Sequence, residues 1–203
     1  MGLFDVFSRD RRDRQTEQPS VGSGERATAA VDYSPLVPMA ALISNDDPRV
    51  AADMTLLAAG YDSFRAAHPE WCATMQFGDV EPAHYDATIR DVFVYWLVGY
   101  NTPYAYGAYI DWKEETGDIV WQLERVTTSL GVALGLAEIA FPGDEDTEAA
   151  LRQIAQHVSE RGYTLTVIDT ESDSYHLYLV PRAEHERMVT LGAAVGFHIY
   201  TLG

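Results

Sequence analysis

The fold is set by one stretch of the chain, Tyr163-Thr-Leu-Thr-Val-Ile168, Asp169-Thr-Glu-Ser-Asp-Ser174 and Tyr175-His-Leu-Tyr-Leu-Val180. Its outer parts alternate apolar and other residues with a period of two, which is typical of β-strands. The central part consists of residues that favour turns. The stretch therefore predicts a β-hairpin with strands over 163–168 and 175–180.

Helical patterns flank this hairpin on both sides. Before it, Asp146 is a typical N-cap residue, an apolar stripe follows at helical spacing, and Gly162 marks the helix end. After it, Pro181 opens a helix that runs through Ala194, and residues 196–202 form a last strand. The apolar run 132–141 supplies a first strand, although its three alanines also suit a helix. The order is then β-α-β-β-α-β, which predicts a ferredoxin-like antiparallel sheet with helices on one face.

The preceding region has mostly helical patterns. Asp47-Pro48 and Glu81-Pro82 are helix starts, a third helix covers 118–130, and a short strand is expected at 105–110. Residues 1–32 are polar and rich in turn-forming residues, which predicts a disordered tail. We therefore expect one α+β domain over 33–203, with a mostly helical part at 33–130 and a sheet-containing part at 131–203.

Charge is the most unusual property of the 203-residue chain. Its 14 Lys and Arg against 31 Asp and Glu give a net charge of −17. The first 30 residues contain five arginines and five acidic residues, so the whole of −17 falls on residues 31–203. Such a surface disfavours nucleic acid, whose phosphates need clustered Lys and Arg, and suits a basic protein partner. The acidity can also serve solubility alone.

Location is indicated by what the sequence lacks. Cys72 is the single cysteine, so no intramolecular disulfide is possible, which fits a reducing compartment. The longest apolar run, 92–98, is far short of the ~20 residues that span a bilayer. We therefore expect a cytoplasmic protein with no membrane span.

Aromatic residues are concentrated in the segment from Tyr100 to Trp112. Tyrosine and tryptophan are enriched where proteins bind one another, and acidic side chains lie among them here. The segment is a candidate contact surface, or else a packed seam of the core. The candidate binding residues in it are Tyr104, Tyr106, Tyr109, Asp111 and Trp112.

The predicted sheet supplies a second candidate surface. If the aliphatic residues of the strands face the helices, the opposite face displays His176, Tyr178, His198 and Tyr200. This face is either covered by the N-terminal helices as internal packing or available to a partner or small ligand.

Motifs for catalysis or metal binding are absent from the sequence. The six histidines form no metal-binding pair, and the turn at 169–173 lacks the glycine and the glutamate of a calcium loop. Lys113 has acidic neighbours, which keep a lysine protonated and unsuited to nucleophilic attack. We therefore predict no catalytic residue, no metal and no cofactor, and the sequence favours a binding protein over an enzyme.

Two motifs carry a resemblance, Tyr106-Gly-Ala-Tyr-Ile-Asp-Trp-Lys-Glu-Glu115 and Ile119-Val-Trp-Gln-Leu123. They resemble bacterial domains of unknown function, over roughly residues 40–203. The resemblance implies no activity and no functional residues. In composition alone, the small acidic chain also resembles bacterial immunity proteins that neutralise basic toxins.

Three functional hypotheses follow. The first is a non-enzymatic module, immunity-like or regulatory, that binds a basic protein through the Tyr100–Trp112 segment. The second is a small-molecule sensor or enzyme with a pocket between the helical part and the sheet, lined by His176, His198 and Asp111. The third is self-association through the last strand, if that strand is an exposed edge. The oligomeric state itself is not predicted.

Overall fold

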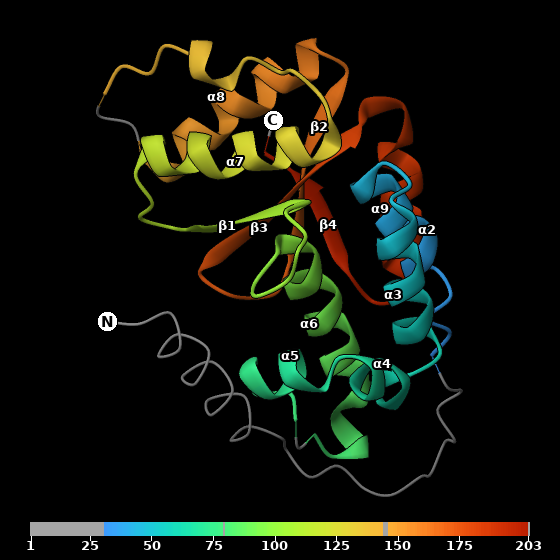
Figure 1. The fold of residues 1–203 in the computed structure, drawn as a ribbon. Coiled ribbons are helices and arrows are strands. Elements are labelled where there is room, and N and C mark those ends of the chain that lie inside the picture. Colours follow the sequence, from blue (N-terminus) through green and yellow to red (C-terminus); the bar gives the residue numbers. More distant parts are fainter. Residues whose placement is uncertain (1–30, 79, 144–145, 203) are drawn as a thin grey trace, which may run out of the picture. The chain divides into compact units, whose positions relative to one another are not determined.

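A computed structural model describes residues 31–78, 80–143 and 146–202 (Figure 1). Of the tail predicted for residues 1–32, residues 1–30 lie outside the described residues. The helical part begins with α2 (Leu36–Ser44), α3 (Pro48–Ala58), α4 (Tyr61–Ala67) and α5 (Pro69–Thr74). It continues with a 3-10 turn, η1 (Pro82–His84), and with α6 (Tyr85–Val98).

Local signals explain where these helices begin and end. The Asp47 side chain accepts a hydrogen bond of 2.9 Å from the Arg49 backbone N–H, and Pro48 occupies the first helical position, as predicted. Gly60, with φ of 129°, interrupts the helical backbone and separates α3 from α4. Gly99 ends α6 in the left-handed conformation.

The sheet-containing part has β1 (Gly107–Asp111), α7 (Thr116–Leu130), the 3-10 turn η2 (Leu136–Glu138) and α8 (Thr147–Glu160). It continues with β2 (Tyr163–Asp169), β3 (Ser174–Pro181), the 3-10 turn η3 (Arg182–Glu184), α9 (His185–Ala194) and β4 (His198–Thr201). The predicted hairpin is confirmed as β2 and β3. Helices and a four-stranded antiparallel sheet make the protein α+β.

The strand predicted at 132–141 was wrong, because this segment is a loop that contains η2. Gly135 adopts a left-handed backbone with φ of 61°, which breaks an extended strand. The apolar residues that suggested a strand instead anchor the loop, since Leu134 and Leu136 are both buried. The first strand of the sheet is β1, close to the strand expected at 105–110.

Strand order differs from the ferredoxin-like prediction. The order is β1-β3-β2-β4, with every neighbouring pair antiparallel, so β4 lies beside β2. The ferredoxin-like order, which places the last strand beside the first, is not confirmed. The connections β1 to β2 and β3 to β4 cross the sheet in the same direction, although β1 and β3 run in opposite directions. If both crossovers have the usual right hand, their helices lie on opposite faces.

Helices accordingly cover both faces of the sheet. The prediction that the helices of the ferredoxin-like arrangement share one face was wrong, because α9 lies opposite α7 and α8, whereas covering of the second face by N-terminal helices, one of the two alternatives above, is found for α2 and α6. On one side, α7 packs against β1 and β3, and α8 packs against β2. On the other side, α6, α9 and α2 pack against β1, β4 and β3 respectively (Figure 1). The α6 side is fixed by Tyr178, which is fully buried and donates a hydrogen bond of 3.1 Å to the Val94 carbonyl.

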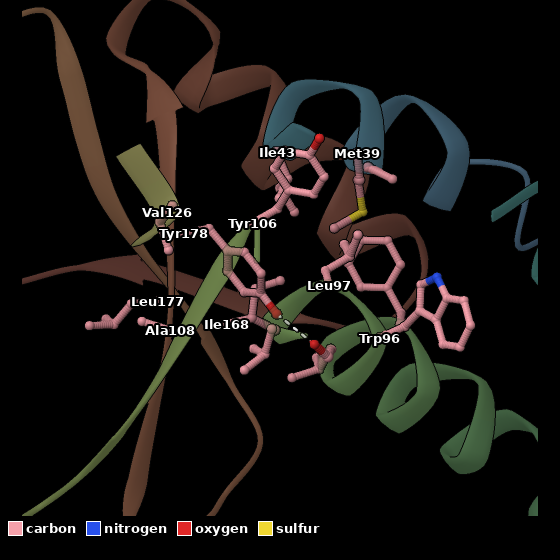
Figure 2. Close-up of a cluster of buried hydrophobic side chains, with 14 of the residues drawn as sticks. Met39, Ile43, Trp96, Leu97, Tyr106, Ala108, Val126, Ile168, Leu177 and Tyr178 are labelled. Atoms are coloured by element: carbon pink, nitrogen blue, oxygen red, sulfur yellow. Dashed lines mark hydrogen bonds between the residues drawn. The ribbon is translucent and has the colours of Figure 1, made fainter. Parts of the chain in front are cut away.

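Figure 2 shows this core at the sheet. Met39 of α2 and Leu97 of α6 lie on the Tyr178 side, whereas Val126 of α7 lies near Leu177 and Ala108. Because both faces are packed, buried residues occur at consecutive positions of β2 and β3, such as Leu177 and Tyr178. Alternation in sequence therefore does not distinguish an inner from an outer face here.

The predicted aromatic face is divided between the two sides of the sheet. In β4, Ile199 is opposite Ile168 and Tyr200 is opposite Val167. Directly opposed residues share a face, so His198 and Tyr200 lie on the α7–α8 side. His176 and Tyr178 lie on the other side, where both are fully buried. The expectation that all four residues share one face was therefore wrong.

The sheet has β1 and β4 as its edge strands. Self-association through the last strand requires that β4 lie at an edge of the sheet, as it does here. Self-association itself stays a hypothesis. Within the described residues, no helix is both long and apolar enough to cross a membrane.

Candidate functional site

Two of the predicted contact residues are part of the interior. Tyr104 and Tyr106 are each only 6% exposed. The Tyr104 hydroxyl donates to an Asp53 carboxylate oxygen at 2.7 Å, and the Tyr106 hydroxyl donates to Asp47, also at 2.7 Å. Burial and these carboxylates raise both tyrosine pKa values. These two hydrogen bonds therefore attach the segment before β1 to α3 and to its N-cap.

A second group of predicted residues surrounds a buried histidine. His176 is fully buried, its ring centre is 5.3 Å from that of the half-buried Tyr109, and its Nδ1 lies 3.2 Å from the Thr170 hydroxyl. Burial lowers the pKa of His176 to about 4, so the ring is neutral at neutral pH. Its Nε2 has no hydrogen-bond partner among the described residues.

The remaining predicted residues, Asp111, Trp112, His198 and Tyr200, lie nearer the surface. Asp111 ends β1 and accepts a hydrogen bond of 2.9 Å from the Lys113 backbone N–H. This turn leaves the Trp112 side chain outside the sheet, with 54% of its surface exposed. Trp112 is thus a large apolar side chain held at the surface by a defined turn.

Trp112 and Tyr200 help to line a hollow of about 450 Å³, here called the smaller hollow. Its lining residues are Trp112, Val167, Asp169, Ser172, Asp173, Ser174, Tyr175 and Tyr200. These come from the end of β1, the β2–β3 hairpin and β4. The smaller hollow therefore lies on the α7–α8 side of the sheet, toward the hairpin turn.

A larger hollow of about 740 Å³ adjoins it, because Trp112 and Tyr175 line both. The larger hollow lies between the β1–α7 loop and the start of α8. The Thr147 hydroxyl donates to the Glu114 carbonyl at 3.2 Å and ties these segments together. Its charged lining residues are Lys113, Glu114, Glu115, Asp146 and Glu148, and Phe141 adds a further aromatic ring.

The lining charges are strongly one-sided. Together the two hollows have the carboxylates of Glu114, Glu115, Asp146, Glu148, Asp169 and Asp173 against the ammonium of Lys113. Burial raises the pKa of Glu114, and neighbouring acids add to this rise. The backbone N–H of Glu171, with a smaller contribution from His198, keeps the pKa of Asp169 below its usual value. Asp169 is therefore ionised throughout the physiological pH range.

The tyrosines of the smaller hollow are held close to these acids. Burial and then Glu148 raise the pKa of Tyr175. Burial, Asp169 and Tyr175 raise the pKa of Tyr200. His198 adds its Nδ1 at 3.2 Å from Asp169 Oδ2. The site thus combines aromatic surface with negative charge, which suits a cationic ligand.

The chain itself contains a cation on one of these rings. The ammonium of Lys113 lies 4.0 Å from the centre of the Trp112 ring. Lys113 lines only the larger hollow, whereas Trp112 lines both. A second exposed tryptophan, Trp121 on α7, is 58% exposed, pairs with Arg125 at 5.1 Å, and lines neither hollow.

Sequence reasoning missed Tyr175, Asp169 and Asp173. The acidic run 169–173 was interpreted only as a hairpin turn and a failed calcium loop. The available signal was that Tyr175 follows this turn and is two residues from Leu177, so both side chains lie on the same face of the strand. That Tyr200 lies on the same face as Tyr175 follows from the register of β4, which the sequence pattern does not give.

The pocket predicted from His176, His198 and Asp111 does not assemble at either hollow, because His176 is buried on the other side of the sheet. Nor does any group of three or more His, Cys, Asp or Glu among the described residues have a geometry suited to a metal ion.

A different histidine borders a third hollow, of about 550 Å³, on α4 and α5. His68 lines it together with Glu70, Thr74 and Asn101. Behind His68, the Asp53 carboxylate accepts hydrogen bonds from Trp96 Nε1 at 3.1 Å and from Tyr104. His68 Nε2 lies 3.1 Å from Asp53 Oδ1, close enough for an ion pair but not aligned for a hydrogen bond.

A family model, described as a domain of unknown function (DUF6630), matches residues 36–203. The chain belongs to this family. The DUF6630 match begins at Leu36, the first residue of α2, and includes all the residues that line the three hollows. Neither a search of curated proteins nor a search of solved structures finds a significant match.

Proposed function

We propose that this protein is a non-enzymatic binding module that holds a basic segment of a partner protein in the two adjoining hollows. The observation that carries the proposal is the joint lining by the exposed Trp112, three half-buried aromatic rings and six carboxylates, with Lys113 as the one cation among the described lining residues. Long-range attraction to the −17 chain would speed encounter, and the aromatic residues would supply affinity after contact.

The hollows favour binding over catalysis because of their charge and openness. A cationic side chain placed there meets carboxylates on several sides and loses little hydration at a surface site. The partner we envisage is therefore a basic protein, as an immunity protein or an acidic regulator would bind.

Direct titration of a basic probe tests this proposal. The probe is a fluorescein-labelled peptide with alternating glycine and mixed lysine or arginine, and the readout is fluorescence anisotropy with the full chain. The double variant Glu115→Gln, Asp173→Asn removes one exposed carboxylate from each hollow. Affinity should fall about fivefold to tenfold at low salt, which corresponds to about 0.5–0.7 kcal/mol for each of the two charges.

A matched control removes the same charge elsewhere. Glu160 and Glu186 are exposed and line neither hollow. The variant Glu160→Gln, Glu186→Gln should stay within about twofold of the wild type. Equal losses in the two double variants would mean that net charge alone attracts the peptide, and the proposed site would be abandoned.

A second candidate function, binding of a small molecule, is supported by the third hollow. There a carboxylate that accepts two hydrogen bonds lies directly behind the partly exposed His68. A thermal-shift screen of nucleotides and common metabolites, on the wild type and on His68→Gln, tests it. A ligand that stabilises the wild type and not the variant would support this function, and a uniform absence of shifts would reject it.

A further inference from the structure

The smaller hollow differs from the larger one in the absence of any cation from its described lining. Its walls are the rings of Trp112, Tyr175 and Tyr200, and its carboxylates are those of Asp169 and Asp173. Lys113, which partly neutralises the larger hollow, does not line the smaller one. The smaller hollow thus has aromatic and anionic surface with no neutralising group among the described residues that form it.

We propose that the smaller hollow binds the guanidinium group of a partner arginine, so that one arginine anchors the basic segment. This inference rests on the proposed function and specifies the ligand that the site selects. The occupant is an arginine side chain rather than a cation of any kind.

Ring geometry favours a flat cation. A guanidinium is planar, weakly hydrated and able to stack on aromatic faces, whereas a lysine ammonium is compact and strongly hydrated. The Lys113 ammonium already lies 4.0 Å from the centre of the Trp112 ring, and Lys113 lines only the larger hollow. Tyr175 and Tyr200 offer further ring surface, and the volume of about 450 Å³ is ample for an arginine side chain.

Hydrogen-bond acceptors complete the match. A guanidinium has five N–H donors in a fixed fork, so a selective site must offer several acceptors. Two carboxylates supply these acceptors, and Ser172 and Ser174 of the hairpin turn also line the hollow, with their hydroxyls 2.8 Å from each other. Ser172 is in turn 2.9 Å from Thr170, whose hydroxyl contacts the buried His176. These contacts fix the shape of the hairpin turn between Asp169 and Asp173.

Asp169 is the fixed counter-ion in this arrangement. One of its oxygens accepts a hydrogen bond of 2.7 Å from the Glu171 backbone N–H, and the other faces His198 at 3.2 Å. These contacts orient the carboxylate, and each oxygen retains a lone pair. Asp173, which is exposed, gives a second carboxylate at the rim.

The test compares three labelled peptides that differ only in the side chain alternating with glycine: arginine, lysine, or citrulline, which has the shape of arginine without its charge. Affinity is measured by anisotropy on the full chain. The arginine peptide should bind about fivefold to tenfold more tightly than the lysine peptide, and the citrulline peptide should bind more weakly than either. Chemical shifts should change at the Trp112 indole N–H.

Two tryptophan variants locate the anchor. Trp112→Ala should remove the preference for arginine, so that arginine and lysine peptides bind alike. Trp121→Ala removes an equally exposed tryptophan outside both hollows and should leave the preference unchanged. Tyr200→Phe, which keeps the ring and the packing, should retain most of the preference.

The possible outcomes separate this inference from the proposed function. Equal binding of arginine and lysine peptides, weakened by Glu115→Gln, Asp173→Asn, would overturn the arginine anchor and leave the basic-segment function standing. Binding of neither peptide would overturn both. A preference for arginine that is lost in Trp121→Ala, or retained in Trp112→Ala, would place the anchor elsewhere and overturn the inference.

Discussion

The Tyr100–Trp112 segment places aromatic residues beside carboxylates both before and after β1. The pairs before β1 stabilise the interior, whereas those after it face solvent. At the start of the segment, Tyr104 and Tyr106 are buried and donate to Asp53 and Asp47. At its end, Trp112 is exposed beside acids that face hollows. An aromatic residue near a carboxylate is thus a structural fastener when the hydroxyl meets the acid in the interior. It is a candidate binding surface when ring and acid both face solvent.

Removing a buried tyrosine that donates to a carboxylate should have the largest effect on stability. Tyr104→Ala should lower the free energy of unfolding by about 3–5 kcal/mol, because a cavity opens and Asp53 loses a donor. Urea denaturation followed by circular dichroism measures the change. A loss below about 1 kcal/mol would contradict the fastener role.

The buried His176, near the β2–β3 turn, predicts that the free energy of unfolding depends on pH. The folded-state pKa of His176 is about 4, below the ordinary value of 6.5. The unfolded chain therefore binds a proton that the folded chain does not, between roughly pH 6.5 and pH 4. Stability should fall as the pH decreases through this window, by roughly 3 kcal/mol in total, and be unaffected by His176 above it.

Variants separate this titration from that of the carboxylates. The pH slope of the free energy of unfolding, from urea melts, should flatten in His176→Asn and stay as in the wild type in His84→Gln, since His84 is exposed. An unchanged slope in His176→Asn would mean that His176 is not the group that titrates.

Close packing between β1 and β3 gives a prediction of intermediate size. A Cβ at Gly107 would lie 2.6 Å from Cε1 of Tyr178 and 3.1 Å from the Val98 side chain. Because Tyr178 is fully buried, the ring has little room to move. Gly107→Ala should therefore lower the free energy of unfolding by about 1–3 kcal/mol, and Gly117→Ala, in open space, should not. Equal stability of the two variants would show that the ring can relocate.

The smallest effect on stability is expected at the exposed end. Trp112→Ala should change the free energy of unfolding by less than about 0.5 kcal/mol, because more than half of the side chain is already in solvent. Thermal melts of this variant and of Trp121→Ala check it. A large loss at Trp112 would make it a second fastener, and the contrast between the two ends would disappear.

Much of the fold follows from local rules. The Asp47 and Asp146 caps, the helix end at Gly162 and the β2–β3 hairpin were all predicted from residues that are neighbours in sequence. The position of β4 was not, because it depends on which sheet edge the last crossover reaches. The loop at 132–141 misled because buried apolar residues anchor loops as well as strands.

The site was predictable only in part for the same reason. Trp112 and Tyr200 were identified by residue type and alternation. Tyr200 is brought to this site by the register of β4 against β2, and Trp112 by the register of β1 against β3; no local pattern connects these positions to Tyr175, Asp169 and Asp173. The interior role of Tyr104 and Tyr106 likewise depends on Asp53 and Asp47, more than 50 residues earlier in the chain.

The most direct test of the central claim is the affinity of the basic peptide for the full chain at about 50 mM and about 300 mM NaCl, with Trp112→Ala measured alongside. The account predicts a loss of affinity of about tenfold or more in the wild type at the higher salt concentration. It also predicts weaker binding by the variant at both concentrations. Binding that ignores both salt and Trp112 would contradict the proposal that the acidic, aromatic hollows hold a basic partner.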